Sequence, residues 1–188
     1  MRRAVRLYVS ASADLEAERD LTGRLVVGMP VTLGWQIGRA PLPGHERDEV
    51  TVHVAPHDCD LYIFMLGRDI TAPAGIEWDA AHEVQHPILA LLKNTPRTPA
   101  GLVFQQLGIG EWIRYSSRAE FERIVRAWLV RQLLDGQDRF GLVLTEVEAL
   151  IVLGARLARE AEAPPAPASD PERSAGGAGV ILATHAVE

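Results

Sequence analysis

Two histidines and a glutamate have the spacing of a metal-binding helix. His82, Glu83 and His86 form the string H-E-x-x-H. On a continuous helix this string puts two imidazoles one turn apart on one face, with the carboxylate placed to activate a zinc-bound water. Pro87 follows His86 directly, and the residue before a proline is disfavoured in the helical conformation. A zinc peptidase is therefore one alternative, and exposed histidines at a helix end are the more ordinary interpretation.

A carboxylate a few residues earlier, Glu77, offers different chemistry. We expect it at the start of a helix over 76–85, between the apolar segments 61–66 and 87–92. If those segments are parallel strands, the helix start lies near their carboxyl ends, where open α/β sheets bind ligands. A carboxylate there can stabilise an oxocarbenium-like ribosyl centre or attack it. The alternative is that Glu77 only complements the positive end of the helix dipole.

The elements that must position these residues alternate between strands and helices. The strand-like segments are β-branched, aromatic or continuously apolar, and we expect them at 5–10, 30–35, 61–66, 87–92 and 111–115. A charged helix is expected from Asp14, and residues 94–110, punctuated by Pro and Gly, are expected to form a loop. This order predicts an α/β domain, a three-layer sandwich with a five-stranded, mostly parallel sheet.

Two capping boxes mark the last helices. Ser117 with Glu120 precedes one amphipathic helix, and Thr145 with Glu148 repeats the pattern before a second. The second helix has no partner in a five-stranded sheet, so we expect it to pack on another subunit or on the side of the domain. The predicted organisation is an α/β domain at 4–135, a helical appendage at 140–160 and a flexible Pro/Ala/Gly-rich tail or linker at 161–188.

Composition narrows the function classes. The net charge of −6 argues against a nucleic-acid-binding face, and no G-x-x-x-x-G-K-[ST] loop is present. The single cysteine, Cys59, cannot form an internal disulfide, so a cytoplasmic location is expected, with Cys59 as a small buried hydrophobe. No apolar run approaches the roughly 20 residues that span a bilayer, and we expect no membrane segment.

Three segments together resemble one protein family. The run LYVSASADLEAERD (7–20) is similar to the F-I-S-S-P-x-D-x-x-x-E-R-D opening of prokaryotic TIR-like domains. CDLYIFMLG (59–67) resembles that family's C-D-hydrophobic-L-G strand, and Glu77-x-x-x-Ala81 followed by Pro87-Ile88-Leu89 resembles its E-x-x-x-A…K-P-I-L segment. The resemblance covers about residues 5–130, and it implies that the sandwich is flavodoxin-like or TIR-like. These domains often stand at the N-terminus of signalling or defence proteins, and related nucleoside 2-deoxyribosyltransferases and TIR NAD glycohydrolases use a catalytic Glu at the corresponding position.

The resemblance implies a site and a substrate. Glu77 would face a glycosidic carbon, with NAD or a nucleoside as substrate and no separate cofactor. The residues implied to bind the substrate are Ser10, Ser12, Asp14, Trp35 (near a base), Gly67 and Asp69. The expected partners are a small nucleotide ligand, a second copy of the chain, and a fused or associated effector domain. A noncatalytic, self-associating signalling module remains an alternative.

Overall fold

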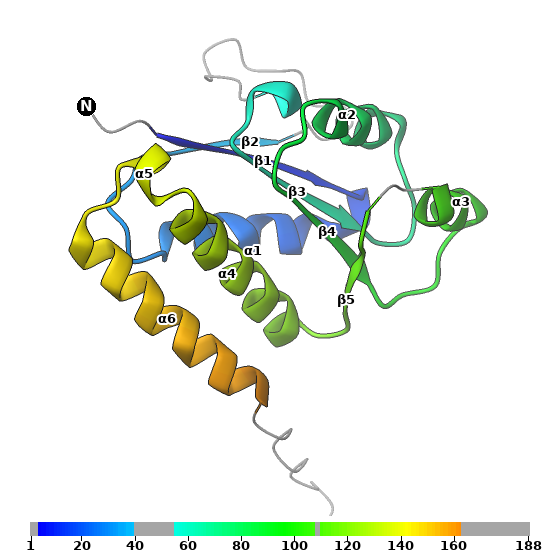
Figure 1. Ribbon diagram of the computed structural model, residues 1–188. Helices are drawn as coiled ribbons and strands as arrows, with labels where there is room; N and C mark the ends of the chain where they lie inside the picture. The colour runs from blue at the N-terminus through cyan, green and yellow to red at the C-terminus, as the bar shows by residue number, and fades with distance from the viewer. Residues whose placement is uncertain (1–3, 40–54, 108–109, 163–188) are drawn as a thin grey trace, which may run out of the picture.

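Five parallel strands form the centre of the molecule. The computed structural model describes residues 4–39, 55–107 and 110–162 (Figure 1). The strand order is β2-β1-β3-β4-β5, and every neighbouring pair is parallel. The predicted flavodoxin-like three-layer sandwich is thus confirmed, with a sheet that is parallel throughout. The bounds of the strands are Val5–Ala11 (β1), Trp35–Arg39 (β2), Leu61–Leu66 (β3), Ile88–Lys93 (β4) and Ile113–Tyr115 (β5).

Helices cover both faces of the sheet (Figure 1). Alternate side chains of a strand point to opposite faces. Leu7 and Val9 of β1 belong to a core cluster with α1 and α4, whereas Tyr8 packs in a separate aromatic cluster with α2. The short helix η1 (Ala13–Leu15) precedes α1 (Glu16–Val27), and the remaining helices of the sandwich are α2 (Ala72–Glu83), α3 (Pro99–Leu107) and α4 (Arg118–Asp135).

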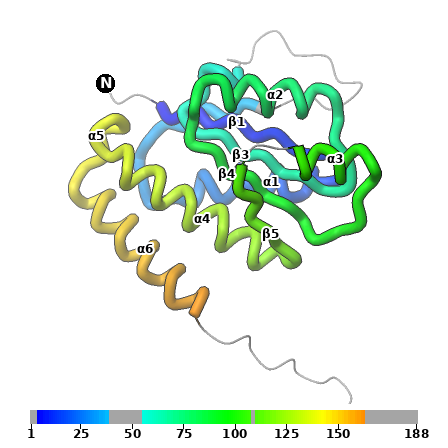
Figure 2. Tube along the Cα trace, turned by 45° about the vertical axis from the view of Figure 1, so that its right-hand side comes forward, coloured from blue at the N-terminus to red at the C-terminus, as the bar shows by residue number. Residues whose placement is uncertain are grey.

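The last helix belongs to the same core. After α5 (Gln137–Phe140), α6 (Leu144–Glu162) lies alongside α4 in both views (Figures 1 and 2). Leu150 and Leu157 of α6 are buried in the α1–α4 cluster. The sequence predicted that this helix packs either on another subunit or on the side of the domain. The inner face of α6 packs on the side of the domain.

Four local predictions need correction. The second strand begins at Trp35, where its pairing with Val5 of β1 starts, so 30–35 was placed too early. The helix expected from 76 begins at Ala72, because Pro73 is tolerated in its first turn. The expected loop at 94–110 contains α3. The capping box at Thr145 does not form, since α6 already begins at Leu144.

Some expectations fall outside the described residues. The sequence period near 46–57 fits either a helix or a strand. This segment lies outside the described residues except for its last residues, which enter the short helix η2 (Pro56–Asp58). The expected tail also lies outside, apart from residues 161 and 162 at the end of α6. No helix in the described part of the chain is long and apolar enough to cross a membrane.

Candidate active site at Glu77

Glu77 lies in the second turn of α2, not at its start. The helix is capped at Thr71 and begins at Ala72. The helix dipole acts mainly within the first turn, so the dipole interpretation accounts poorly for a carboxylate at this depth. The side chain is half-buried and points to the sheet, which means that its partners define its role.

Two hydroxyls from β1 hold the carboxylate. Tyr8 Oη donates a hydrogen bond of 2.7 Å to Glu77 Oε1, and Ser10 Oγ donates one of 2.6 Å to Oε2. Tyr8 and Ser10 are two residues apart on a strand, so both reach the same face of the sheet. Hydrogen bonds to an ionised acceptor are roughly twice as strong as neutral ones, and a pair of them fixes the orientation of the carboxylate. Each oxygen keeps a second lone pair for a further contact.

A second tyrosine packs beside the hydrogen-bonded group of Glu77, Tyr8 and Ser10. Tyr62 of β3 lies opposite Tyr8 in the sheet, with the two rings stacked at 5.9 Å between centroids. The Tyr62 hydroxyl is buried and has no hydrogen-bond partner among the described residues; it approaches Ser10, but outside hydrogen-bonding geometry. Burial raises the pKa of Tyr62 well above its ordinary value, and the charge of Glu77 adds to the rise. Tyr62 therefore stays a neutral phenol beside Glu77.

Three of the predicted residues meet where β1 and β3 end. Ser12 Oγ accepts a hydrogen bond of 2.9 Å from the Gly67 amide, and the Asp14 carboxylate accepts one of 3.1 Å from the Arg68 amide. A Cβ added at Gly67 would lie 2.4 Å from Asp14 Oδ2, so glycine permits this close approach. Ser12, Asp14 and Gly67 thus shape the carboxyl edge of the sheet through contacts with one another.

The other two predicted binding residues lie elsewhere. Asp69 is exposed and accepts hydrogen bonds from Thr98 Oγ1 at 2.6 Å and from the Ile70 amide at 2.8 Å; these bonds, the Thr98 bond foremost, lower the pKa of Asp69. Trp35 pairs with Val5 at the opposite end of β1 and packs against the α1–α4 core. The structure therefore brings Ser10 to Glu77 and does not bring Trp35 there.

The H-E-x-x-H string is divided by the end of α2. The helix ends at Glu83, and Gln85 has a positive φ of 56°, so His86 leaves the helix as Pro87 predicts. His82 Nδ1 lies 2.9 Å from the Trp78 carbonyl, and His86 Nε2 lies 3.1 Å from the His57 carbonyl. The described residues contain no group of three or more His, Cys, Asp and Glu that could hold a metal ion. His82 and His86 therefore do not share one face of a helix, as the zinc peptidase alternative requires.

Sequence reasoning missed the tyrosines of this site. Tyr8 was read only as part of a buried strand, yet it donates to the same carboxylate as Ser10. The signal was present, because Tyr8 and Ser10 share one face of the strand VRLYVSA. Tyr62 could be found only through the pairing of β1 with β3.

Comparison with known proteins adds no family. No protein-family model matches the chain, and no curated protein matches it.

Proposed function

We propose that this chain is a TIR-like domain that binds a nucleotide and cleaves or transfers at its N-glycosidic bond, in prokaryotic signalling or defence. The substrate is NAD or a nucleoside, and Glu77 is the catalytic residue. The observation that carries the proposal concerns the carboxylate of Glu77, on the second turn of α2. The hydroxyls of Tyr8 and Ser10 on β1 hold it by hydrogen bonds. Such preorientation is what transition-state stabilisation by a fixed charge requires.

The chemistry uses the free lone pairs of the carboxylate. The bond between the anomeric carbon and the base nitrogen breaks, and the base leaves with the bonding electrons. Nicotinamide leaves neutral, whereas a nucleoside base takes up a proton, which is balanced by the proton that the attacking water or acceptor base releases. Glu77 either stabilises the cationic ribosyl centre or bonds to it, and water or an acceptor base then completes the transfer. Tyr8 and Ser10 are positioning residues, because they act through Glu77.

Turnover assays of matched variants test the role of Glu77. Release of free base from NAD and from ribo- and deoxyribonucleosides is measured by chromatography with wild type, Glu77→Gln and Asp79→Asn. Asp79 is an exposed carboxylate on the same helix and serves as the control. We expect Glu77→Gln to lower kcat by about 100-fold or more and Asp79→Asn to change it less than about twofold. Turnover insensitive to Glu77→Gln, or none by wild type on any of these substrates, contradicts the proposal.

A noncatalytic, self-associating module is the second candidate. It is favoured by one observation, the large apolar side chains that α6 exposes on the side away from α4: Leu144, Ile151 and Val152. Light scattering over a range of concentrations tests it, and a strict monomer argues against it.

A further inference from the structure

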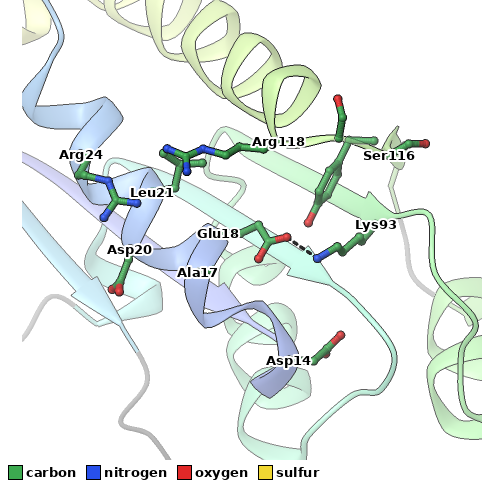
Figure 3. Close-up of a pocket in the computed structure, with 11 residues that line it drawn as sticks. Asp14, Ala17, Glu18, Asp20, Leu21, Arg24, Lys93, Ser116 and Arg118 are labelled. Atoms are coloured by element: carbon green, nitrogen blue, oxygen red, sulfur yellow. Dashed lines mark hydrogen bonds and ion pairs between the residues drawn. The ribbon is translucent and has the colours of Figure 1, made fainter. Parts of the chain in front are cut away.

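A cavity lies on the face of the sheet opposite Glu77, between α1 and the start of α4. Its volume is about 530 Å³, within the size range of small-molecule sites. Figure 3 shows Glu18 and Leu21 on α1, Arg118 at the start of α4, and Lys93 joined to Glu18. The lining residues from α1 and the turn before it are Asp14, Ala17, Glu18, Asp20, Leu21 and Arg24, and those from the strand ends and α4 are Lys93, Tyr115, Ser116, Ser117 and Arg118.

A buried hydroxyl in this cavity has no acceptor. Tyr115 is only 2% exposed, and its hydroxyl has no hydrogen-bond partner in the described part of the chain. Burial, followed by the charges of Glu18 and Asp14, raises the pKa of Tyr115 above its ordinary value, which places the phenol beside the acidic side chains of the cavity. Leaving a buried donor unsatisfied costs about 1–3 kcal/mol. A ligand oxygen in the cavity would supply the missing acceptor.

The start of α4 supplies further donors. Ser117 caps the helix and accepts a hydrogen bond of 3.2 Å from the Glu120 amide, which leaves the amides of Arg118 and Ala119 without an intrahelical partner. Amides in this position, together with the helix dipole, favour an anion. In an 18-residue helix the dipole is fully developed.

Two cations with spare donors line the cavity at this helix end, and a third lines it from α1. Arg118 uses its Nε for Glu122 at 2.8 Å, and Lys93 uses one hydrogen of its ammonium for Glu18 at 2.5 Å. Arginine offers five donors and lysine three, so most of them remain available. Arg24 is exposed and lines the same cavity. The donor set fits the several oxygens of a phosphate, since Arg and Lys are the usual phosphate partners.

The α1 side of the cavity also carries carboxylates, which supply no hydrogen-bond donor to a phosphate. Asp14 and Asp20 line the cavity from the α1 side, and ionised carboxylates only accept hydrogen bonds. A second anionic group of the ligand would gain no donor from these carboxylates, whereas a hydroxyl-bearing part of the ligand would donate to their oxygens. The two walls thus require a phosphate at one end of the ligand and hydroxyls at the other.

We propose that this cavity binds a small sugar phosphate. The phosphate lies at the start of α4 between Arg118 and Lys93, and the Tyr115 hydroxyl donates to one of its oxygens. The sugar hydroxyls are directed at Asp14 and Asp20. The site is separate from Glu77 and does not depend on the proposed N-glycosidic activity. Ribose 5-phosphate is a suitable probe because it has no N-glycosidic bond to be cleaved.

Calorimetric titration of the full chain with ribose 5-phosphate, ribose and inorganic phosphate tests the site. We expect ribose 5-phosphate to bind more tightly than either fragment. Arg118→Gln should weaken it about tenfold or more and Tyr115→Phe about fivefold or more, as expected for hydrogen bonds to a charged group. Arg131→Gln is the matched control, because Arg131 forms the same kind of i,i+4 pair, with Asp135, at the far end of α4; it should change affinity less than about twofold.

The outcomes separate the parts of the proposal. Absence of saturable binding, or equal binding by wild type, Arg118→Gln and Tyr115→Phe, overturns it. If ribose binds as tightly as ribose 5-phosphate, the proposed phosphate contacts are wrong. If inorganic phosphate binds as tightly as ribose 5-phosphate, the proposed sugar contacts are wrong. Thermal unfolding guards against misfolding: since the Tyr115 hydroxyl has no partner, Tyr115→Phe should melt at or above the wild-type temperature. Glu77→Gln should bind the probe like wild type, whatever the outcome of the turnover assay.

Discussion

At the scale of single residues, the partners of a carboxylate indicate its role better than its sequence position does. Glu146 is buried and accepts hydrogen bonds from the amides of Thr32 and Val143 at 2.8 and 2.9 Å. The Thr32 bond ties α6 to the segment before β2, and the Val143 bond caps the start of α6, so both serve the structure. Glu77 is half-buried, and it accepts hydrogen bonds from two side-chain hydroxyls of one strand. Among the described residues no backbone group donates to Glu77, so these bonds orient the carboxylate without capping a chain segment.

Cys59 should be inert in the folded protein. It is buried, its Sγ donates to the Pro56 carbonyl at 3.1 Å, and burial is the main cause that raises its pKa to about 12. The thiolate is the reactive form, so little of it is present at pH 8. We expect the native thiol to react with a disulfide reagent on the order of 1,000 times more slowly than the thiol of the urea-unfolded chain. Absorbance of the released chromophore measures both rates, and comparable rates would show that Cys59 is accessible.

At the scale of elements, the two predicted capping boxes differ in a measurable way. Ser117 caps α4, and Glu120 reaches back to the Ser116 amide at 2.8 Å. Thr145 instead lies inside α6, and the side chain of Glu146 accepts the capping hydrogen bond from the Val143 amide. Ser117→Ala should lower the free energy of unfolding by about 1 kcal/mol. Thr145→Ala should change it by less than about 0.5 kcal/mol or raise it, because alanine has the higher helix propensity. Urea denaturation measures both, and equal losses would contradict this assignment of the caps.

The elements found from sequence are those whose signal is local. β3 was located to the residue, because its six apolar side chains are buried on both faces. The start of β2 was misplaced because Val31 and Leu33 pack against the core from an irregular segment, so burial there carries no strand geometry. The helix α3 was missed because Pro99 and Gly101 within it were read as loop signals. Its close packing explains the glycine: a Cβ at Gly101 would lie 2.8 Å from the Arg68 carbonyl.

The candidate site was only partly predictable for a similar reason. Glu77 and Ser10 came from a resemblance of motifs, and the structure joins them by a hydrogen bond. Tyr8 and Tyr62 depend on which side of β1 meets α2 and on the register between β1 and β3. These are relations between elements distant in sequence, and no local pattern encodes them. The cavity at Tyr115 likewise requires α1, β4 and α4 to be placed together.

At the scale of the whole molecule, α6 separates an inner from an outer face. Its inner face packs on α4 through Leu150 and Leu157, and Gly154 allows the close approach of Val130. Its outer face leaves Ile151 and Val152 more than half exposed, at 55% and 67%. Neighbouring exposed apolar side chains on one helix face are a feature of association surfaces.

The second candidate function, a self-associating module, predicts a second copy of the chain on this face of α6. Antiparallel pairing centred on Val152 would bring Glu148 of one copy beside Arg156 of the other, twice by symmetry. Ile151→Lys should therefore abolish dimerisation, because it buries a charge at the centre of the contact. Val27→Lys is the control, since Val27 is equally apolar and 80% exposed but lies at the end of α1. Sedimentation velocity across a hundredfold range of concentration measures the dimer fraction. A wild type that stays monomeric throughout, or a dimer that Ile151→Lys leaves intact, removes this interface and with it the main support for a self-associating module.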